Sequence, residues 1–193
     1  MLTVEGVIRG LKASKGPLPE GLATREKGVY ALWLDYEGFS QLGITPGRDL
    51  IAYVGVAGGD GGLGARFRQE WRPTNSGRSS PRRTIGALLQ RRLKLKPRPR
   101  SGKAARSSEY FAFGEEGERA FTAWIEAHAT FGYLVLRPED LGSVVRVQDV
   151  ETVLIRQLHP PLNISKWRNP QKGKIAAARS KAARKAARYA VKI

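Results

Sequence analysis

The fold is decided by two short stretches, GVYALWL at Gly28–Leu34 and LIAYVGV at Leu50–Val56. Both are rich in β-branched and aromatic residues and are bounded by Gly or Asp, a pattern that predicts β-strands. The residues between them are polar and include glycines, which is typical of a long hairpin loop. We therefore expect two neighbouring strands joined by a connection that returns the chain.

The remainder of the chain divides into patterned segments and basic loops. Apolar residues spaced by three and four predict helices, and short apolar runs predict further strands. The expected helices are Ala65–Trp71, Thr84–Leu93, Glu115–Thr130 and Val147–Leu158, and the expected strands are Glu109–Phe113 and Gly132–Leu136. Arg72–Arg83 and Lys94–Ser108 are expected to be loops. No internal repeat is present.

The positive charge is concentrated in two segments. The chain carries 34 Lys and Arg against 17 Asp and Glu, a net charge of +17. Twelve basic residues fall in Trp71–Ser108 and ten in Lys166–Ile193, and neither segment contains an acidic residue, so the remainder has 12 basic against 17 acidic residues, a net −5. A solvated face is the alternative, but acid-free stretches of this length favour phosphate backbones through counterion release.

The C-terminal segment is rich in alanine as well as in Lys and Arg. Alanine favours helix, whereas like charges spaced by three and four repel, so we expect a helix that is marginal when alone and ordered by phosphates. An amphipathic membrane helix is the competing interpretation. Its non-basic face offers methyl groups rather than Leu, Phe or Trp, so nucleic acid is favoured over membrane.

Composition excludes several classes of protein. Hydrophobic residues make up 41% of the chain, enough for one core, so a wholly disordered basic protein is not expected. The chain has no Cys and two His, which excludes disulfides, thiolate zinc sites and Cys nucleophiles. No apolar run approaches the ~20 residues of a membrane span, and Met1–Lys15 lacks the apolar region of a signal peptide. We expect a soluble, cytoplasmic protein.

One residue interrupts an apolar stripe. In the helix expected at Val147–Leu158 the apolar residues recur at helical spacing, and the missing member of the stripe is Glu151. A buried carboxylate needs a cation or a charge-assisted hydrogen bond. Glu151 is therefore either a metal ligand facing a cleft or an edge residue that pairs with an arginine.

A G-x-G-x-x-G pattern occurs at Gly59, Gly61 and Gly64, between an expected strand and an expected helix. This is the context of a dinucleotide-binding loop. The acidic residue that should follow about twenty residues later is missing, because the chain reads Ser80-Pro81-Arg82-Arg83 there. A flexible glycine loop is the favoured interpretation, and a nucleotide-dependent enzyme is kept as an alternative.

The tripeptides Gly28-Val29-Tyr30 and Tyr53-Val54-Gly55 resemble the paired motifs of the GIY-YIG nuclease family. The order that follows is more specific: Arg66 after the second tripeptide, then Glu151, and Asn163 twelve residues later. The resemblance covers roughly residues 28–163, and Ser79–Leu89 and Phe121–His128 also resemble connecting segments of small free-standing bacterial members. It implies a small α+β domain, that is a mixed α/β chain in which helices flank a central antiparallel sheet.

The resemblance also implies the roles of five residues. Glu151 matches the ligand of a divalent cation, Mg²⁺ or Mn²⁺, and Arg66 would contact a phosphate. Tyr30 and Tyr53 would place their hydroxyls in the site, with Tyr30 the expected base for the attacking water. Asn163 would hold the loop or the phosphate through its amide.

Two departures concern proton transfer. Glu70 replaces the His or Tyr that many members carry four residues after the arginine, and Val56 replaces a lysine that often follows the second tripeptide. His128 or Arg68 could compensate, although a histidine on the apolar side of a helix is more often a packing residue. The tripeptides are also separated by a longer loop than is usual.

The sequence thus predicts a metal-dependent DNA endonuclease acting on double-stranded DNA, and nucleoid-associated when bound. The domain is expected at 28–165 with a basic insertion at 72–108, after an N-terminal extension at 1–27 and before a basic tail at 166–193. A restriction enzyme that cuts a palindrome would be a homodimer. The alternative is a non-catalytic nucleic-acid-binding module on the same scaffold. The expected nucleic-acid contacts are Arg68, Arg78, Arg82, Arg83, Lys166, Arg168, Arg179, Arg184, Lys185 and Arg188.

Overall fold

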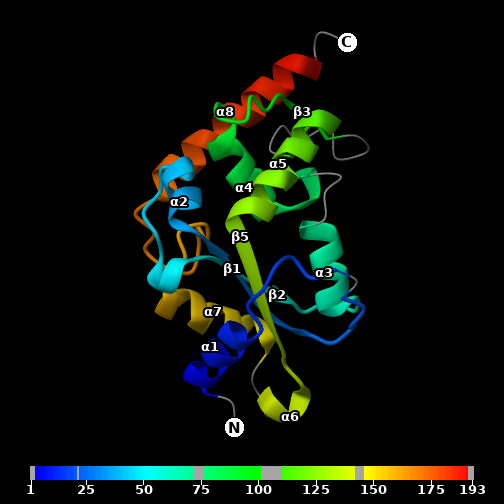
Figure 1. Ribbon diagram of the computed structural model, residues 1–193, viewed down its shortest axis with the longest axis vertical. Helices are drawn as coiled ribbons and strands as arrows, with labels where there is room; N and C mark the ends of the chain where they lie inside the picture. Colours follow the sequence, from blue (N-terminus) through cyan, green and yellow to red (C-terminus); the bar gives the residue numbers. More distant parts are fainter. Residues whose placement is uncertain (1–2, 21, 72–75, 101–109, 142–145, 191–193) are drawn as a thin grey trace.

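The computed structural model describes residues 3–190 except for 21, 72–75, 101–109 and 142–145. Its centre is a three-stranded antiparallel sheet of order β2-β1-β5 (Figure 1), made of β1 (Gly28–Leu34), β2 (Ile51–Ala57) and β5 (Ala129–Val135). β1 is buried along its whole length because it is the middle strand and both of its faces are covered. The α+β class expected from the sequence is confirmed.

One face of the sheet is covered by α1 (Val4–Ala13) and α7 (Val147–Leu158). Val7 and Leu11 of α1 pack with Leu154 and Leu158 of α7 and with the side chains that this face of β1 presents. Part of the expected N-terminal extension therefore belongs to the core. Thr3 caps α1, since its hydroxyl accepts a hydrogen bond from the Gly6 amide at 3.1 Å.

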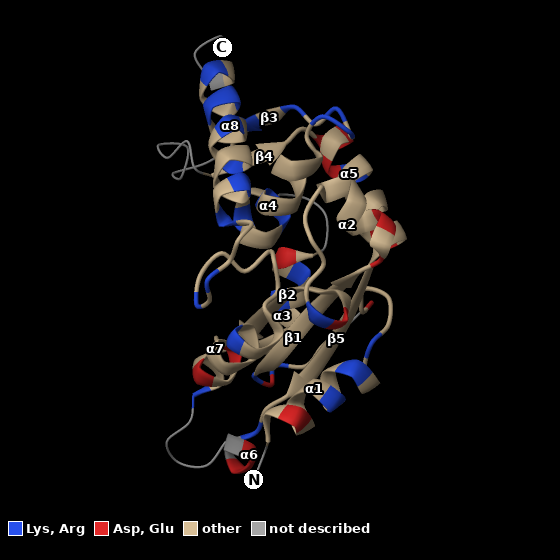
Figure 2. Ribbon diagram, turned by 90° about the vertical axis from the view of Figure 1, so that its left-hand side faces the viewer, with Lys and Arg blue, Asp and Glu red and all other residues tan. Residues whose placement is uncertain are grey.

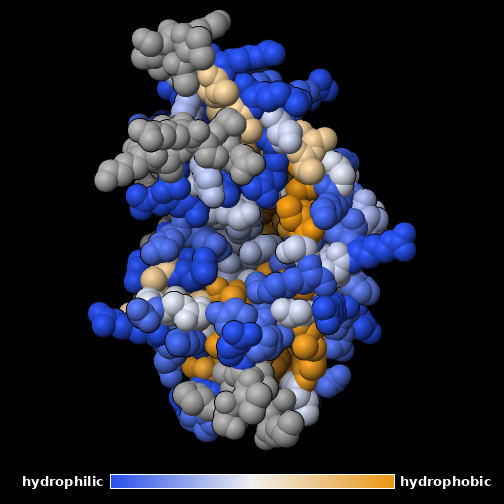
Figure 3. Space-filling model, turned by 180° about the vertical axis from the view of Figure 1, so that it is seen from behind, coloured by the Kyte–Doolittle hydropathy of each residue, from blue (hydrophilic) through white to orange (hydrophobic). Residues whose placement is uncertain are grey.

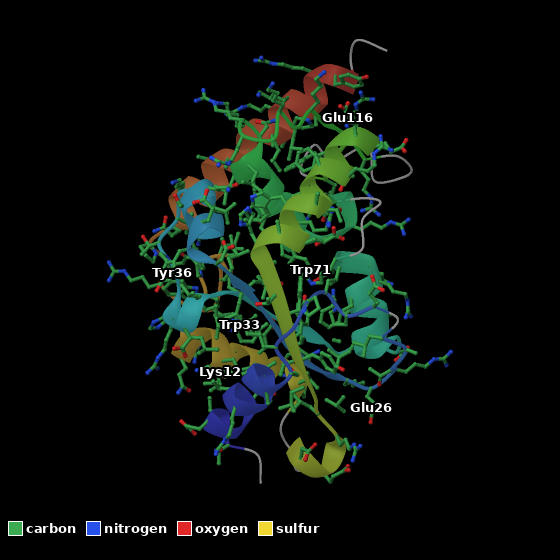
Figure 4. All side chains as sticks on the ribbon, in the orientation of Figure 1. Lys12, Glu26, Trp33, Tyr36, Trp71 and Glu116 are labelled. Atoms are coloured by element: carbon green, nitrogen blue, oxygen red, sulfur yellow. The ribbon has the colours of Figure 1, made fainter. Side chains whose placement is uncertain are left out.

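The other face carries a larger core, built by α3 (Gly62–Glu70), α4 (Ser80–Leu89), α5 (Glu115–His128) and a second, two-stranded sheet of β3 (Pro97–Pro99) and β4 (Phe111–Phe113). Aromatic residues fill it. The Trp71 ring, labelled in Figure 4, lies 5.0 Å from the Phe131 ring of β5. The molecule is elongated because the α4–α5 layer extends beyond the sheet (Figure 1).

Several short elements lie where loops were expected. The connection between β1 and β2 contains α2 (Tyr36–Leu42), which Asp35 caps at its start and Gly43 ends at φ 61°. β3 lies in the expected basic loop. The remaining elements are the 3₁₀ turns η1 (Arg48–Leu50) and η2 (Ser76–Arg78) and the short helix α6 (Pro138–Leu141).

The alanine-rich segment forms α8 (Lys172–Ala190), a helix that packs within the chain. Ile175, Ala182 and Ala186 are buried against α4 and the β3 region. The sequence suggested a helix that phosphates would order, whereas packing of its alanine face already holds it. Lys and Arg are distributed along α8, and no acidic residue lies on it (Figure 2). Seen from behind, the described surface is largely hydrophilic (Figure 3).

Candidate active site

Tyr30 and Tyr53 project from the same face of the central sheet. Tyr53 of β2 lies opposite Leu32 of β1, and side chains two residues apart on a strand share a face. The two tyrosine rings are 6.1 Å apart, centroid to centroid. The sheet thus brings together two hydroxyl-bearing side chains that are 23 residues apart in the sequence, as expected.

The glycines of the two tripeptides leave room for these rings and for close strand packing. A Cβ atom on Gly55 would lie 2.5 Å from the Cζ and hydroxyl of Tyr30, so the Tyr30 ring lies directly over this glycine. A Cβ atom on Gly28 would lie 2.3 Å from the carbonyl oxygen of Leu134 in the segment that forms β5. Both positions therefore require glycine for steric reasons.

Helix α3 adds an arginine and a carboxylate to the tyrosine pair. The Tyr30 hydroxyl donates a hydrogen bond to Oε2 of Glu70, and Arg66 Nη1 donates to Oε1 of the same carboxylate at 2.9 Å. Glu70 is buried, with 7% of its surface exposed. Phe67, one turn from Glu70, packs on the Tyr30 ring at 5.4 Å and fixes the helix against the sheet.

Burial makes both tyrosines weaker acids than a tyrosine in water. Burial is the largest cause that raises the pKa of Tyr30 well above its usual value, followed by Tyr53 and the negative charge of Glu70. The pKa of Tyr53 is raised by burial and then by Glu70 and Glu151. Near neutral pH both side chains are therefore neutral phenols. Burial opposes the charge of Arg66, but Glu70 and the two tyrosines outweigh it and raise the pKa of Arg66.

Glu151 lies in α7, at the edge of the apolar stripe, with 14% of its side chain exposed. Its carboxylate accepts a hydrogen bond from the ammonium group of Lys166, so the partner is a lysine rather than an arginine. Glu151 also acts on the pKa of Tyr53 through its charge, which shows that it lies within electrostatic range of the tyrosine pair.

The donor set around Glu151 fits Mg²⁺ bound through a single carboxylate. The described residues contain no group of three or more His, Cys, Asp or Glu side chains that could enclose an ion. Mg²⁺ does not need one, because it commonly keeps several waters and takes one or two carboxylates together with substrate phosphates. The ammonium of Lys166 on the carboxylate shows that this position accommodates a cation.

Asn163 completes the edge of the sheet. Its Nδ2 donates to the carbonyl of Val54 and its Oδ1 accepts from the Val54 amide, both at 2.8 Å. β2 is an edge strand of the sheet formed by the described residues, so the Asn163 amide satisfies backbone groups on its outer side. With its amide engaged in this way, Asn163 holds the loop and β2 rather than a phosphate.

A family model described as the GIY-YIG catalytic domain matches residues 28–186. The chain belongs to the GIY-YIG family. Searches of curated proteins and of solved structures found no match. Membership confirms the resemblance drawn from the two tripeptides, and it identifies the domain as a nuclease domain, whose substrates are nucleic acids. Among the described residues no helix is long and apolar enough to cross a membrane.

The expected nucleic-acid contacts of this GIY-YIG protein differ in accessibility. Arg82 is 1% exposed, and its guanidinium donates to Glu118, Thr122 and the Trp71 carbonyl, so its assignment as a nucleic-acid contact is wrong. Arg83 is also buried, and its guanidinium lies 5.0 Å above the Tyr110 ring. Side chains at the surface are Arg68, Arg78, Lys166, Arg168, Arg184, Lys185 and Arg188, and Arg179 is half-buried.

The glycine loop before α3 has a structural role in this GIY-YIG domain. The amides of Leu63 and Gly64, at the start of α3, donate to the carbonyls of Glu26 and Thr24 at 3.0 Å. A phosphate cradle would need these amides free, so the interpretation as a glycine loop is supported over a dinucleotide site. A Cβ on Gly64 would lie 2.4 Å from the Leu22 carbonyl, which explains the glycine.

Neither residue proposed to compensate for the family departures belongs to the tyrosine group. His128 pairs with Asp35 at 3.1 Å and packs on Trp124, so it joins α2 to α5. Arg68 donates to the carbonyl of Leu22. Glu70, which the sequence presented only as a departure from the family, is the residue that contacts Tyr30. Its spacing of four from Arg66 predicts only that these two side chains are neighbours on a helix, and the sequence carries no signal for the contact with Tyr30.

Proposed function

We propose that this protein is a divalent-metal-dependent endonuclease that hydrolyses phosphodiester bonds in double-stranded DNA. The observation that carries the proposal is the group Tyr30–Glu70–Arg66, in which Tyr30 and Glu70 are buried. Glu151 of α7 lies within electrostatic range of Tyr53, the second tyrosine of the pair. A base, a guanidinium and a cation-binding carboxylate are the parts that phosphodiester hydrolysis needs.

Glu151 would hold the cation, Mg²⁺ or Mn²⁺, and the bound ion would supply positive charge for the phosphate oxygens. Tyr30 is the residue that takes the proton of the attacking water. Because the pKa of Tyr30 is raised, it does so as a phenol that passes its own proton to Glu70, its hydrogen-bond partner. Arg66 lies beside this carboxylate, where its guanidinium can both stabilise Glu70 and contact a phosphate.

A line of arginines connects this group with α8. Burial is the largest cause that lowers the pKa of Arg83 of α4, followed by the charges of Arg179 on α8 and Arg100 after β3, whereas the charge of Glu70 acts in the opposite direction. Arg179 also borders a hollow of about 230 Å³ beside Ile164, next to Asn163. We infer that the DNA backbone runs from the tyrosine pair toward α8 past the half-buried Arg100 and Arg179, because phosphates beside these two side chains would relieve their repulsion with the buried Arg83.

The test is incubation of supercoiled plasmid DNA with the full chain, with and without Mg²⁺ or Mn²⁺. We expect nicked or linear products only when a cation is present. Tyr30→Phe and Glu151→Gln should each reduce the cleavage rate by at least about 100-fold, the scale of general-base and electrostatic contributions. DNA affinity in EDTA should remain within about threefold for both variants, since neither residue belongs to the arginine line. Cleavage that survives both substitutions would contradict the proposal.

The second candidate is a nucleic-acid-binding module without catalytic activity. The observation that favours it is the ion pair of Lys166 with Glu151, which neutralises the carboxylate that should hold the cation. DNA binding without cleavage in any divalent cation, for the natural chain and for a variant that lacks Lys166, would support this candidate over the nuclease.

A further inference from the structure

The ammonium group of Lys166 is paired with the carboxylate of Glu151, on which the proposed cation site depends. Its ammonium group donates to Oε2 of Glu151, and the two side chains are 32% and 14% exposed. The pair therefore joins the loop that follows Asn163 to helix α7, across 15 residues of sequence. It lies at the boundary of the protein, where solvent and a bound polyanion can both reach the lysine.

The loop that carries Lys166 is held in place on both sides. Trp167 donates from its indole to the Asn163 carbonyl at 2.8 Å, and its ring stacks on His159 at 4.9 Å. Asn169 donates to the carbonyls of Pro161 and Asn163 at 2.8 and 2.9 Å. These contacts fix the backbone around Lys166 and leave only its flexible side chain free to change partner.

The backbone of Lys166 has φ 73°, in the left-handed region that non-glycine residues seldom adopt. The anchoring contacts of Trp167 and Asn169 maintain this conformation. The unusual turn places the start of the lysine side chain within reach of α7. A lysine in this turn is therefore directed to Glu151 by the fold of the loop and not by chance contact of two mobile surface groups.

An ammonium group and a divalent cation cannot both occupy the same carboxylate without repulsion. A largely buried carboxylate also needs one of them, because an unpaired buried charge is costly. The ammonium group of Lys166 is compact and stands at the end of a long, flexible side chain. A phosphate can therefore attract it away from Glu151 while the backbone stays in place. Its neighbours in sequence belong to the acid-free C-terminal segment, which suits contact with a phosphate.

We propose that Lys166 is a built-in counter-ion of Glu151 that competes with the divalent cation and is released to a DNA phosphate. This inference rests on the proposed function, in which Glu151 holds the cation. Binding of DNA then frees Glu151, so DNA and cation each strengthen the binding of the other. The coupling is reciprocal by thermodynamic necessity, and typical couplings between sites are about 5- to 150-fold.

The experiment measures Mn²⁺ binding by the full chain, from the electron paramagnetic resonance signal of free Mn²⁺, with and without a short DNA duplex. A Tyr30→Phe background prevents cleavage during the measurement. The test variants are Lys166→Met and Lys166→Gln, and Lys172→Met is the matched control because Lys172 is an exposed lysine at the start of α8. Thermal unfolding of each variant checks that it is folded.

We expect DNA to tighten Mn²⁺ binding about tenfold in the Tyr30→Phe protein and in the Lys172→Met control. Either Lys166 variant should bind Mn²⁺ about tenfold more tightly without DNA, and added DNA should tighten Mn²⁺ binding less than in the Lys172→Met control, because phosphate ligation remains while the release of Lys166 no longer contributes. In all proteins Glu151→Gln should abolish the Mn²⁺ site. Unchanged Mn²⁺ affinity in both Lys166 variants would overturn the competition, and a DNA effect as large in the Lys166 variants as in the control would overturn the release to phosphate.

These failures are distinguishable from failure of the proposed function. If Glu151→Gln removes Mn²⁺ binding while the Lys166 variants behave like the control, the cation site stands and the role of Lys166 is wrong. If no Mn²⁺ site depends on Glu151 in any protein, with or without DNA, the proposed cation site itself is wrong and the inference about Lys166 falls with it.

Discussion

Glu70 is the residue on which the proposed mechanism depends most. One carboxylate oxygen accepts the Tyr30 hydroxyl and the other accepts Arg66. This arrangement gives a phenol with a raised pKa a proton acceptor in direct contact, so Tyr30 need not ionise in solution before it can act. The guanidinium of Arg66 holds the second carboxylate oxygen in place.

Replacement of Glu70 by glutamine should change both the rate of cleavage and its pH dependence. Without a proton acceptor, Tyr30 would have to lose its proton to solvent, so we expect cleavage at pH 7 to fall about 100-fold. The rate of Glu70→Gln should then rise about tenfold per pH unit, since only the phenolate is active. The charge and the hydrogen bond of Glu70 both raise the pKa of Tyr30, so this pKa should be lower in Glu70→Gln. The increase in cleavage rate should therefore level off at a lower pH than the pKa of Tyr30 in the natural protein.

Single-turnover cleavage rates from pH 6 to 10 provide the measurement, and Gln69→Ala is the matched control on the exposed side of α3. A Glu70→Gln protein with the natural rate and the natural pH profile would show that the carboxylate takes no proton from Tyr30. A loss of activity with an unchanged profile would indicate a structural role.

Individual site residues could be predicted from the sequence where the spacing of apolar residues along a helix points to them. Glu151 could be singled out because a carboxylate interrupts an apolar stripe. Its partner Lys166 could not, since a left-handed lysine in a loop leaves no periodic trace. Glu70 was equally hidden, because an arginine and a glutamate four residues apart are neighbours on any helix and the tyrosine that completes the group is 40 residues away.

Among the elements, α7 ends where the sequence predicted, because an apolar stripe defines its length and Pro160 and Pro161 stop it. α2 was missed, although Asp35 and Gly43 provide a cap at either end. A helix of seven residues has too few turns for its apolar spacing to stand out from a polar loop. Tertiary contacts with β1 and α4 stabilise it instead.

A buried ion pair joins α4 and α5. Its arginine was expected to contact a phosphate because it lies in an acid-free basic segment. Arg82 Nη2 donates to Glu118 Oε2 at 3.0 Å, and Glu118 also accepts from the Ser76 amide and hydroxyl and from the Phe113 amide. The Arg82 guanidinium stacks on the Phe121 ring at 4.5 Å. The pair thereby joins η2, α4, β4 and α5 at one point.

Arg82→Met should therefore affect stability and leave DNA binding nearly unchanged. It would leave Glu118 buried without its cation, which costs about 3–5 kcal/mol in the free energy of unfolding. Arg78→Met is the matched control in the same basic segment, because Arg78 is exposed. It should change stability by less than about 0.5 kcal/mol and weaken DNA binding. Urea unfolding and DNA titration at a temperature where both variants are folded test this contrast, and the reverse pattern would contradict it.

Over the whole molecule, charge is distributed along the long axis. α1 and α8 lie at opposite ends (Figure 1), and α8 and β3, which both belong to acid-free segments, lie at the same end as the acidic first turn of α5 (Figure 2). The sequence could locate this charge along the chain. It could not show that α8 is also part of the core, because a run of alanines does not by itself reveal whether another element packs on it. Deletion of α8 would remove the buried Ile175 and Ala182 and uncover the surfaces of α4 and β3 against which they pack, as well as remove charge, so substitution is the better test.

The double variant Arg184→Gln/Arg188→Gln should reduce the dependence of DNA binding on salt without unfolding the protein. Both side chains are exposed on α8 and each would contact one phosphate, so the slope of log K against log salt should become shallower by about 1.8, at about 0.9 for each contact. Arg9→Gln/Arg25→Gln removes the same charge from exposed positions away from α8 and should change the slope by less than about 0.5. DNA titrations in EDTA between 50 and 300 mM salt, on the order of the range over which phosphate contacts weaken, measure both slopes. Equal slopes in the two double variants would mean that net charge, and not the position of α8, determines how this protein holds DNA.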